Sequence, residues 1–128
     1  MSSEKKKILV VEDHPETAEL TRLELEHIGY PATSCVANGA DALRKAHEER
    51  PDLILLDILL PGMNGLEIAR RLKADPDTRD IRILAVTGKA MPGDREKCLE
   101  NGCDGYLAKP FFPRKLKEEI EKLLPDCP

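Results

Sequence analysis

Aromatic residues are scarce in this chain of 128 residues. It has no Trp, and Phe, Tyr and Trp together make up only 3% of the sequence. The hydrophobic share of 41% therefore comes mainly from aliphatic side chains. This length and composition are typical of one compact globular domain with an aliphatic core.

The sequence also lacks an excess of positive charge, long apolar runs and a signal peptide. Its formal net charge is −4, which argues against direct binding to a nucleic-acid backbone. No apolar run approaches the ~18 residues of a membrane span, and no apolar segment follows the polar, basic residues 1–7. We therefore expect a cytoplasmic protein that does not insert into membranes.

The cysteines and histidines do not show the spacing of a zinc site. The cysteines are Cys35, Cys98, Cys103 and Cys127. No C-x-x-C pair occurs among them. The histidines are His14, His27 and His47, and they complete no zinc-ligand cluster with the cysteines. We interpret the cysteines as reduced thiols.

Short β-prone runs alternate with longer segments of helical character along the whole chain. Strands are predicted at about residues 8–11, 32–36, 52–57, 83–87 and 105–108. Helices are predicted at about 14–28, from 38–39 to 51, and at about 66–73, 94–101 and 114–124. These units predict a single α/β domain over residues 1–128, with its core at about 7–124. It would be a doubly wound, five-stranded parallel sheet with helices on both faces.

Polar residues stand at the carboxyl ends of four predicted strands. They are Glu12-Asp13 after the first strand, Asp57 at the end of the third, Thr87 at the end of the fourth, and Lys109-Pro110 after the fifth. Parallel strands joined by right-handed crossovers all end at one edge of the sheet. We therefore expect these side chains, which come from distant parts of the sequence, to meet at that edge.

Asp57 ends the apolar run LILL and stands shortly before the loop PGMNG. Alone, it would be interpreted as an ordinary strand terminator. Three carboxylates packed together, however, raise one another's pKa unless a divalent cation binds them, and oxygen-only ligands suit Mg²⁺ better than zinc or copper. A carboxylate beside Mg²⁺, with an ammonium and a hydroxyl group nearby, is equipped for phosphoryl transfer onto an aspartate. This interpretation makes Asp57 the nucleophile.

The pattern resembles the receiver domain of bacterial two-component response regulators over essentially the whole chain. The matching segments are Glu12-Asp13, DILLPGMNG around Asp57, VTG with Thr87, and YLAKPF with Tyr106, Lys109 and Pro110. The resemblance implies a CheY-like, flavodoxin-like fold of the single-domain type. It also implies that a histidine kinase or histidine phosphotransfer protein donates a phosphoryl group from phosphohistidine to Asp57, with Mg²⁺ required. Such a domain is a signalling module that assists its own phosphorylation and dephosphorylation rather than an enzyme.

The resemblance also implies the metal ligands and the role of Lys109. In receivers, the residues matching Asp13 and Asp57 hold the metal together with the main-chain carbonyl of the residue matching Leu59. The residue matching Glu12 usually acts through water. Lys109 would pair with the acceptor and then with the phosphoryl group, and the peptide bond between Lys109 and Pro110 would be cis.

The switch of this family links Thr87 to the aromatic residue at position 106. A phosphoryl group adds charge and acceptor oxygens, which would draw the Thr87 hydroxyl inward and leave room for Tyr106 to rotate behind it. A face made of the fourth helix, fifth strand and fifth helix would then change shape for a downstream protein partner. On the first helix, Leu20 is expected beside Pro110 and Phe111, where receivers dock their phosphodonor.

Several positions depart from the commonest receiver pattern. Leu60 stands where Met is frequent, a volume-conserving change that should be neutral. Leu59 and Lys89 occupy the two variable positions that flank the acceptor, and they should affect phosphoryl lifetime more than its formation. Gly88 has no side chain and leaves the approach to Asp57 open.

Two other classes of protein use similar elements. A haloacid dehalogenase-type phosphohydrolase also has an Asp nucleophile with Thr and Lys partners, but it needs an acid two residues after the nucleophile, where this chain has Leu59. A flavin-binding module needs a hydroxyl- and Gly-rich loop after the first strand, where this chain has EDHPET. We expect a stand-alone receiver, and a receiver excised from a multidomain regulator or hybrid kinase is the alternative.

Overall fold

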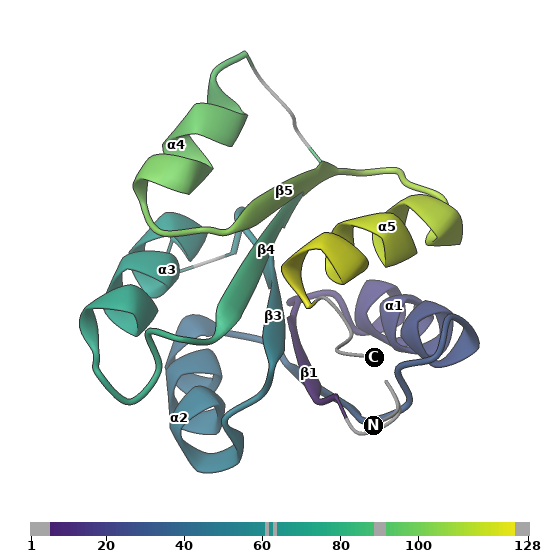
Figure 1. Ribbon diagram of the computed structural model, residues 1–128, viewed down its shortest axis with the longest axis horizontal. Helices are drawn as coiled ribbons and strands as arrows, with labels where there is room; N and C mark the ends of the chain where they lie inside the picture. The colour runs from purple at the N-terminus through teal and green to yellow at the C-terminus, as the bar shows by residue number, and fades with distance from the viewer. Residues whose placement is uncertain (1–5, 61, 63, 89–91, 125–128) are drawn as a thin grey trace.

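The computed structural model describes residues 6–60, 62, 64–88 and 92–124 (Figure 1). Its centre is one sheet in which every neighbouring pair of strands is parallel, in the order β2-β1-β3-β4-β5. The strands are β1 (Ile8–Val11), β2 (Thr33–Val36), β3 (Leu53–Asp57), β4 (Arg82–Thr87) and β5 (Gly105–Ala108). The prediction of a five-stranded parallel sheet is confirmed.

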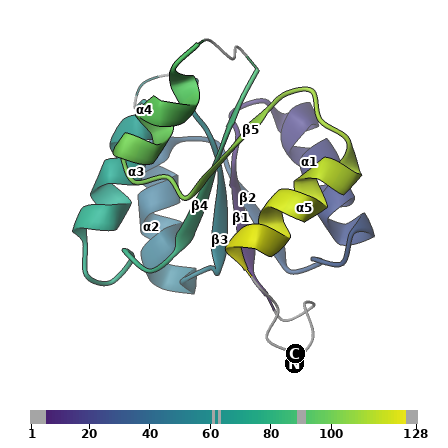
Figure 2. The same ribbon diagram turned by 45° about the horizontal axis from the view of Figure 1, so that its top comes forward.

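Helices cover both faces of the sheet. They are α1 (Pro15–His27), α2 (Gly39–Glu49), α3 (Gly65–Ala74), α4 (Asp94–Glu100) and α5 (Pro113–Leu123). Helices α1 and α5 lie on one face, and α2, α3 and α4 lie on the other (Figures 1 and 2). In the described part of the chain, no helix is both long enough and apolar enough to cross a bilayer.

The core has two halves because side chains alternate along each strand. On β3, Ile54 and Leu56 pack toward α2 and α3, whereas Leu53 and Leu55 pack toward α1 and α5. All of β3 is buried, as its unbroken apolar run predicts for a central parallel strand. Asp57 is the only charged residue in that strand.

Local sequence signals begin and end the helices. Pro15 occupies the first turn of α1, and Asn38 caps α2 by accepting a hydrogen bond from the Asp41 main chain at 2.8 Å. Gly102 follows α4 with a φ of +102°, and a Cβ there would lie 2.7 Å from Cγ of Lys73. Only glycine fits that turn, which therefore ends α4 and leads the chain into β5.

The strand register brings the ends of the central strands to one level. Asp57 pairs with Val86, and Thr87 pairs with Ala108. Beyond the strands, the main chain of Lys109 donates to the Thr87 carbonyl at 2.8 Å. The residues at or just past these strand ends therefore stand side by side at the carboxyl edge of the sheet.

Candidate functional site

The carboxyl edge brings together three charged side chains from distant parts of the chain. Nζ of Lys109 lies 2.9 Å from Oε1 of Glu12 and 4.0 Å from Oδ2 of Asp57. The resemblance implied that Lys109 pairs with the acceptor, and the structure places its ammonium closer to Glu12. The peptide bond between Lys109 and Pro110 is cis, which is the geometry that the resemblance implies.

Asp57 is a buried carboxylate with few compensating partners. Only 8% of its surface is exposed, and its Oδ1 accepts a hydrogen bond from the Leu59 main-chain N at 3.0 Å. Burial, together with the charge of Glu12, raises the pKa of Asp57 above its usual value, although the Leu59 N–H and the Lys109 charge oppose the shift. The positive charge near Asp57 is therefore too small to offset the negative charge of its ionised form.

Glu12 is equally buried but better paired. Burial opposes its ionisation, yet hydrogen bonds from Lys109 and from the His14 main chain outweigh burial and lower the pKa of Glu12. Its two oxygens have different partners, since Oε1 faces Lys109 and Oε2 faces the main chain and ring of His14. Glu12 thus holds the Lys109 ammonium beside Asp57.

Asp13 offers a ligand atom for a cation. Its Oδ1 is buried, and in the part of the chain that the structure describes it has no hydrogen-bond partner. Glu12, Asp13 and His14 each offer one ligand atom within 4.8 Å of the others. A buried carboxylate oxygen without a donor is costly unless a cation satisfies it, so this arrangement fits a divalent ion. His14 was not among the predicted site residues, although its position directly after the acidic pair was a usable signal.

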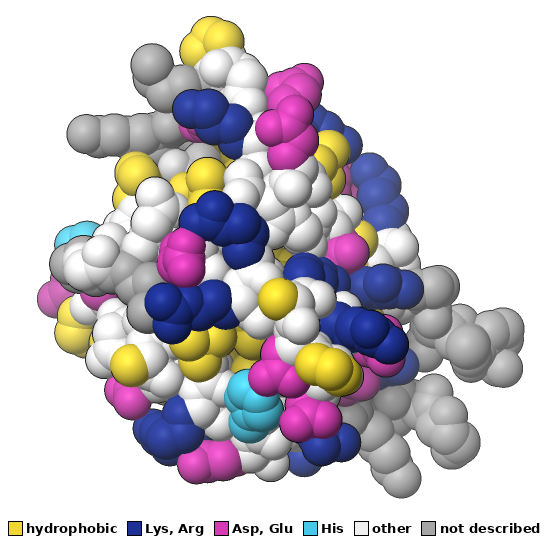
Figure 3. Space-filling model, turned by 90° about the vertical axis from the view of Figure 1, so that its left-hand side faces the viewer, with side chains coloured by type: hydrophobic (Ala, Val, Ile, Leu, Met, Phe, Trp, Pro, Cys, Tyr) yellow, Lys and Arg dark blue, Asp and Glu magenta, His cyan; other side chains and the backbone are white. Residues whose placement is uncertain are grey.

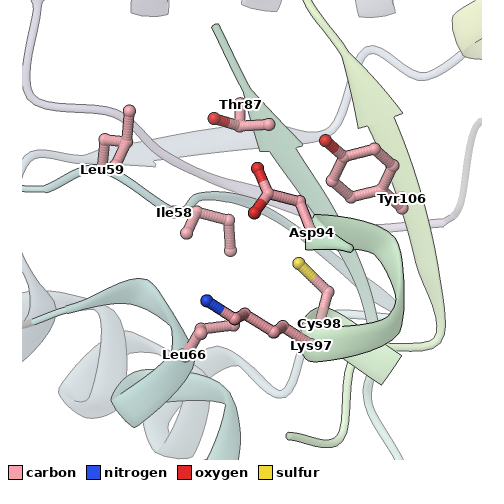
Figure 4. Close-up of a pocket in the computed structure, with 8 residues that line it drawn as sticks. All are labelled: Ile58, Leu59, Leu66, Thr87, Asp94, Lys97, Cys98 and Tyr106. Atoms are coloured by element: carbon pink, nitrogen blue, oxygen red, sulfur yellow. The ribbon is translucent and has the colours of Figure 1, made fainter. Parts of the chain in front are cut away.

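Thr87 and Tyr106 lie on a cavity beside the acidic site. Thr87 is buried, and Tyr106 is partly buried on β5. The cavity measures about 250 Å³, and Figure 4 shows its lining, which comes from four elements or their flanking loops. Its residues are Ile58, Leu59, Leu66, Thr87, Asp94, Lys97, Cys98 and Tyr106. The cavity between α4 and the other lining residues has space for a rotated side chain.

The residues expected at the donor-docking surface lie on α1 and in the loop after Lys109. Leu20 of α1 is 57% exposed, Pro110 is exposed and Phe111 is partly buried. Phe111 lines a shallow hollow together with Thr21 of α1 and with Asp57. The loop after Lys109 and helix α1 therefore adjoin the acceptor on the same side.

The variable positions around the acceptor differ in exposure. Leu59 is 54% exposed, and Leu60 is buried at 8%. Gly88 is exposed, and the open approach to Asp57 stays a prediction. Lys89 lies outside the described residues. Cys35, Cys98 and Cys103 are free thiols, whereas Cys127 also lies outside the described residues.

Known proteins with the same sequence pattern are response regulators. Residues 8–121 match the family model of the response regulator receiver domain. The DivK polar-differentiation response regulator of Brucella anthropi is 42% identical over 122 residues, which is 95% of this chain and 98% of that protein. The Brucella ovis DivK is 40% identical over the same shares.

Solved structures of receivers have the same fold. The receiver domain of the sensor histidine kinase PA1611 from Pseudomonas aeruginosa PAO1, with a magnesium ion in its active-site cleft, is 36% identical with a TM-score of 0.85. The alignment covers 94% of this chain and 98% of that one. Chemotaxis protein CheY4 of Vibrio cholerae is 28% identical with a TM-score of 0.85, over 93% of this chain and 98% of that one. With the family match spanning nearly the whole chain, the protein belongs to the response regulator receiver domain family.

Proposed function

We propose that this receiver accepts a phosphoryl group on Asp57 from the phosphohistidine of a histidine kinase or histidine phosphotransfer protein. The observation that carries the proposal is the buried Asp57 carboxylate at the end of β3, with Oδ1 held by the Leu59 main chain and Oδ2 4.0 Å from the Lys109 ammonium. One oxygen of Asp57 is thus held in place by a hydrogen bond. The carboxylate also stands beside the Lys109 ammonium, which can stabilise phosphoryl oxygens.

The transfer exchanges one bond to phosphorus for another. A carboxylate oxygen of Asp57 forms a bond to phosphorus while the bond between phosphorus and the donor's imidazole nitrogen breaks; that nitrogen keeps the electron pair and takes up a proton from solvent. Lys109 moves from Glu12 toward the new phosphoryl oxygens, and the Thr87 hydroxyl donates to one of them. These contacts place positive charge and a donor where negative charge accumulates.

Magnesium binding is supported by the unpartnered Oδ1 of Asp13 and by the magnesium ion in the PA1611 receiver. Asp13, Asp57 and the Leu59 main-chain carbonyl would hold the ion, and Glu12 would act through water. When bound, Mg²⁺ supplies the charge neutralisation that lets an anionic carboxylate approach an anionic phosphoryl group. Burial raises the pKa of Asp57, so the positive charge of a bound ion would favour its ionised, nucleophilic form.

The output is a protein contact controlled by Thr87 and Tyr106. The cavity of about 250 Å³ beside both residues leaves space for Tyr106 to rotate once Thr87 moves toward a phosphoryl group. That movement would alter the face formed by α4, β5 and α5. The side of the molecule that includes α4 carries hydrophobic side chains among charges of both signs (Figure 3), and Leu99 of α4 is 43% exposed.

The receiver would work as one signalling unit over residues 7–124, with no enzymatic activity beyond its own phosphorylation and dephosphorylation. The donor would dock on Leu20, Pro110 and Phe111, of which Phe111 lines the same hollow as Asp57. The similarity to the response regulator DivK supports a role in signalling. The absence of nucleic-acid binding and the cytoplasmic location stay predictions.

The proposal is tested by incubating the protein with acetyl phosphate and Mg²⁺ and measuring its intact mass. We expect a labile gain of one phosphoryl group in the wild type and none in Asp57→Asn. Asp52→Asn is the matched control, because Asp52 precedes the opposite end of β3 and accepts from the Lys7 main chain at 2.7 Å. A phosphoryl gain at wild-type rate in Asp57→Asn would refute the assignment.

A further inference from the structure

We infer that His14 is a nitrogen ligand at the divalent-cation site and widens its selectivity to cations that favour imidazole, such as Ni²⁺. The inference rests on the proposed function, because it concerns the cation site formed with Asp57. It assigns a role to a side chain that the phosphoryl-transfer chemistry does not use.

The geometry of the His14 ring suits a shared ion. Its Nδ1 lies 3.2 Å from Oε2 of Glu12 and 3.5 Å from Oδ1 of Asp13. Neighbouring ligands of an octahedral ion with bonds of about 2.1 Å lie about 3 Å apart. The 3.5 Å separation from the Asp13 oxygen, which would be a direct ligand, is therefore close to what a shared ion requires, while Glu12 would act through water.

Two further observations favour a ligand role over a purely structural one. The Oδ1 of Asp13, which faces this ring nitrogen, is buried and otherwise lacks a hydrogen-bond donor among the described residues. In addition, His14 is the N-cap residue of α1, but its side chain makes no capping hydrogen bond, and it is 74% exposed. The ring can therefore turn toward an ion without loss to the helix.

The types of ligand atom at this site predict which cations His14 helps to bind. Mg²⁺ prefers oxygen ligands and keeps much of its water, so an imidazole adds little to its binding. Ni²⁺ binds nitrogen ligands well and stands high in the affinity order of divalent metals. The neutral ring would coordinate through Nδ1 and leave its N–H on Nε2 facing solvent. His14 should therefore strengthen Ni²⁺ binding selectively.

A second group of possible ligands, formed by His47, Asp75 and Asp77, provides the control. His47 Nε2 lies 2.7 Å from Oδ2 of Asp75, and among the described residues the buried side-chain oxygen without a hydrogen-bond partner belongs to Asp13 and not to this group. Because this group lies elsewhere on the molecule, its binding must be separated from that of the His14 site. Amide NMR signals do this, since paramagnetic Ni²⁺ broadens only the signals of nearby residues.

The experiment titrates Ni²⁺ into the full chain and follows the signals of residues 12–14 and 57–59. In parallel, Mg²⁺ is titrated and its affinity is taken from the chemical-shift changes of the same residues. The proteins are the wild type, His14→Ala and His47→Ala. We expect His14→Ala to weaken Ni²⁺ binding about tenfold or more, the least effect usual for lost metal-site partners. Its Mg²⁺ affinity should change by less than about twofold, and His47→Ala should match the wild type at these signals.

Unchanged Ni²⁺ affinity in His14→Ala would overturn the inference. Equal weakening of Ni²⁺ and Mg²⁺ would also overturn it, because it would mean that the ring only positions Glu12 or Asp13. A wild type whose signals at residues 12–14 and 57–59 respond to neither cation would refute the proposed cation site itself. These outcomes separate failure of the inference from failure of the proposed function.

Discussion

Replacing Lys109 with Met should destabilise the fold as well as impair phosphorylation. Lys109 Nζ stands 2.9 Å from Glu12 and 4.0 Å from Asp57. At an effective dielectric constant of about 20, unit charges at these two separations attract by roughly 6 and roughly 4 kcal/mol. Desolvation offsets most of this attraction, and removing one partner of a buried pair costs a net 3–5 kcal/mol, roughly. Because the Lys109 side chain is 27% exposed, we expect the lower end, about 3 kcal/mol.

The assay is equilibrium denaturation in urea near neutral pH, with Lys117→Met as control. Lys117 lies on α5 and is exposed. Its replacement should change the unfolding free energy by less than about 0.5 kcal/mol. The loss of unfolding free energy caused by Lys109→Met should be smaller when Asp57→Asn is already present, because one of the two uncompensated carboxylates is then gone. A Lys109→Met protein as stable as the wild type would refute the ion-pair reasoning.

Four further changes probe other parts of the site and fold. Asp57→Asn should melt at or above the wild-type temperature near neutral pH, because a carboxylate with a raised pKa costs stability once pH rises through that pKa; a lower melting temperature would contradict this. Asp13→Ala should weaken Mg²⁺ affinity in calorimetric titration, and unchanged affinity would remove Asp13 from the metal site. Leu20→Ala should slow transfer from the cognate protein donor, with a loss of about 2 kcal/mol in association, while phosphorylation by acetyl phosphate stays unchanged; equal slowing with both donors would indicate a folding or active-site defect. His47→Gln should cost stability at about pH 5.5 but little at about pH 8, since hydrogen bonds to Leu43 and Asp75 raise the His47 pKa and their stabilisation is lost as pH rises through it; a pH-independent difference would contradict the protonated contact.

The elements and their order could be predicted from the sequence because they depend on local patterns. The run LILL before Asp57 predicted a central strand buried on both faces, and all of β3 is buried. Pro15 and Gly29 predicted the limits of α1, which spans Pro15–His27 with Gly29 at a φ of +108°. Since parallel strands end at one edge, the meeting of Glu12, Asp57 and Lys109 followed from the same patterns.

The distances among the side chains of Glu12, Asp57 and Lys109 were decided by the tertiary structure. The placement of Lys109 nearer to Glu12 than to Asp57 depends on how the loops after β1 and β5 approach each other, 97 residues apart in sequence. The cavity beside Tyr106 is likewise lined by residues of separate elements, whereas the approach of the His14 ring to Asp13 is a contact between neighbours in one loop. Residue type and periodicity report which face of an element is buried, whereas hydrogen bonds and charge pairing require separations of a few ångströms that only packing determines.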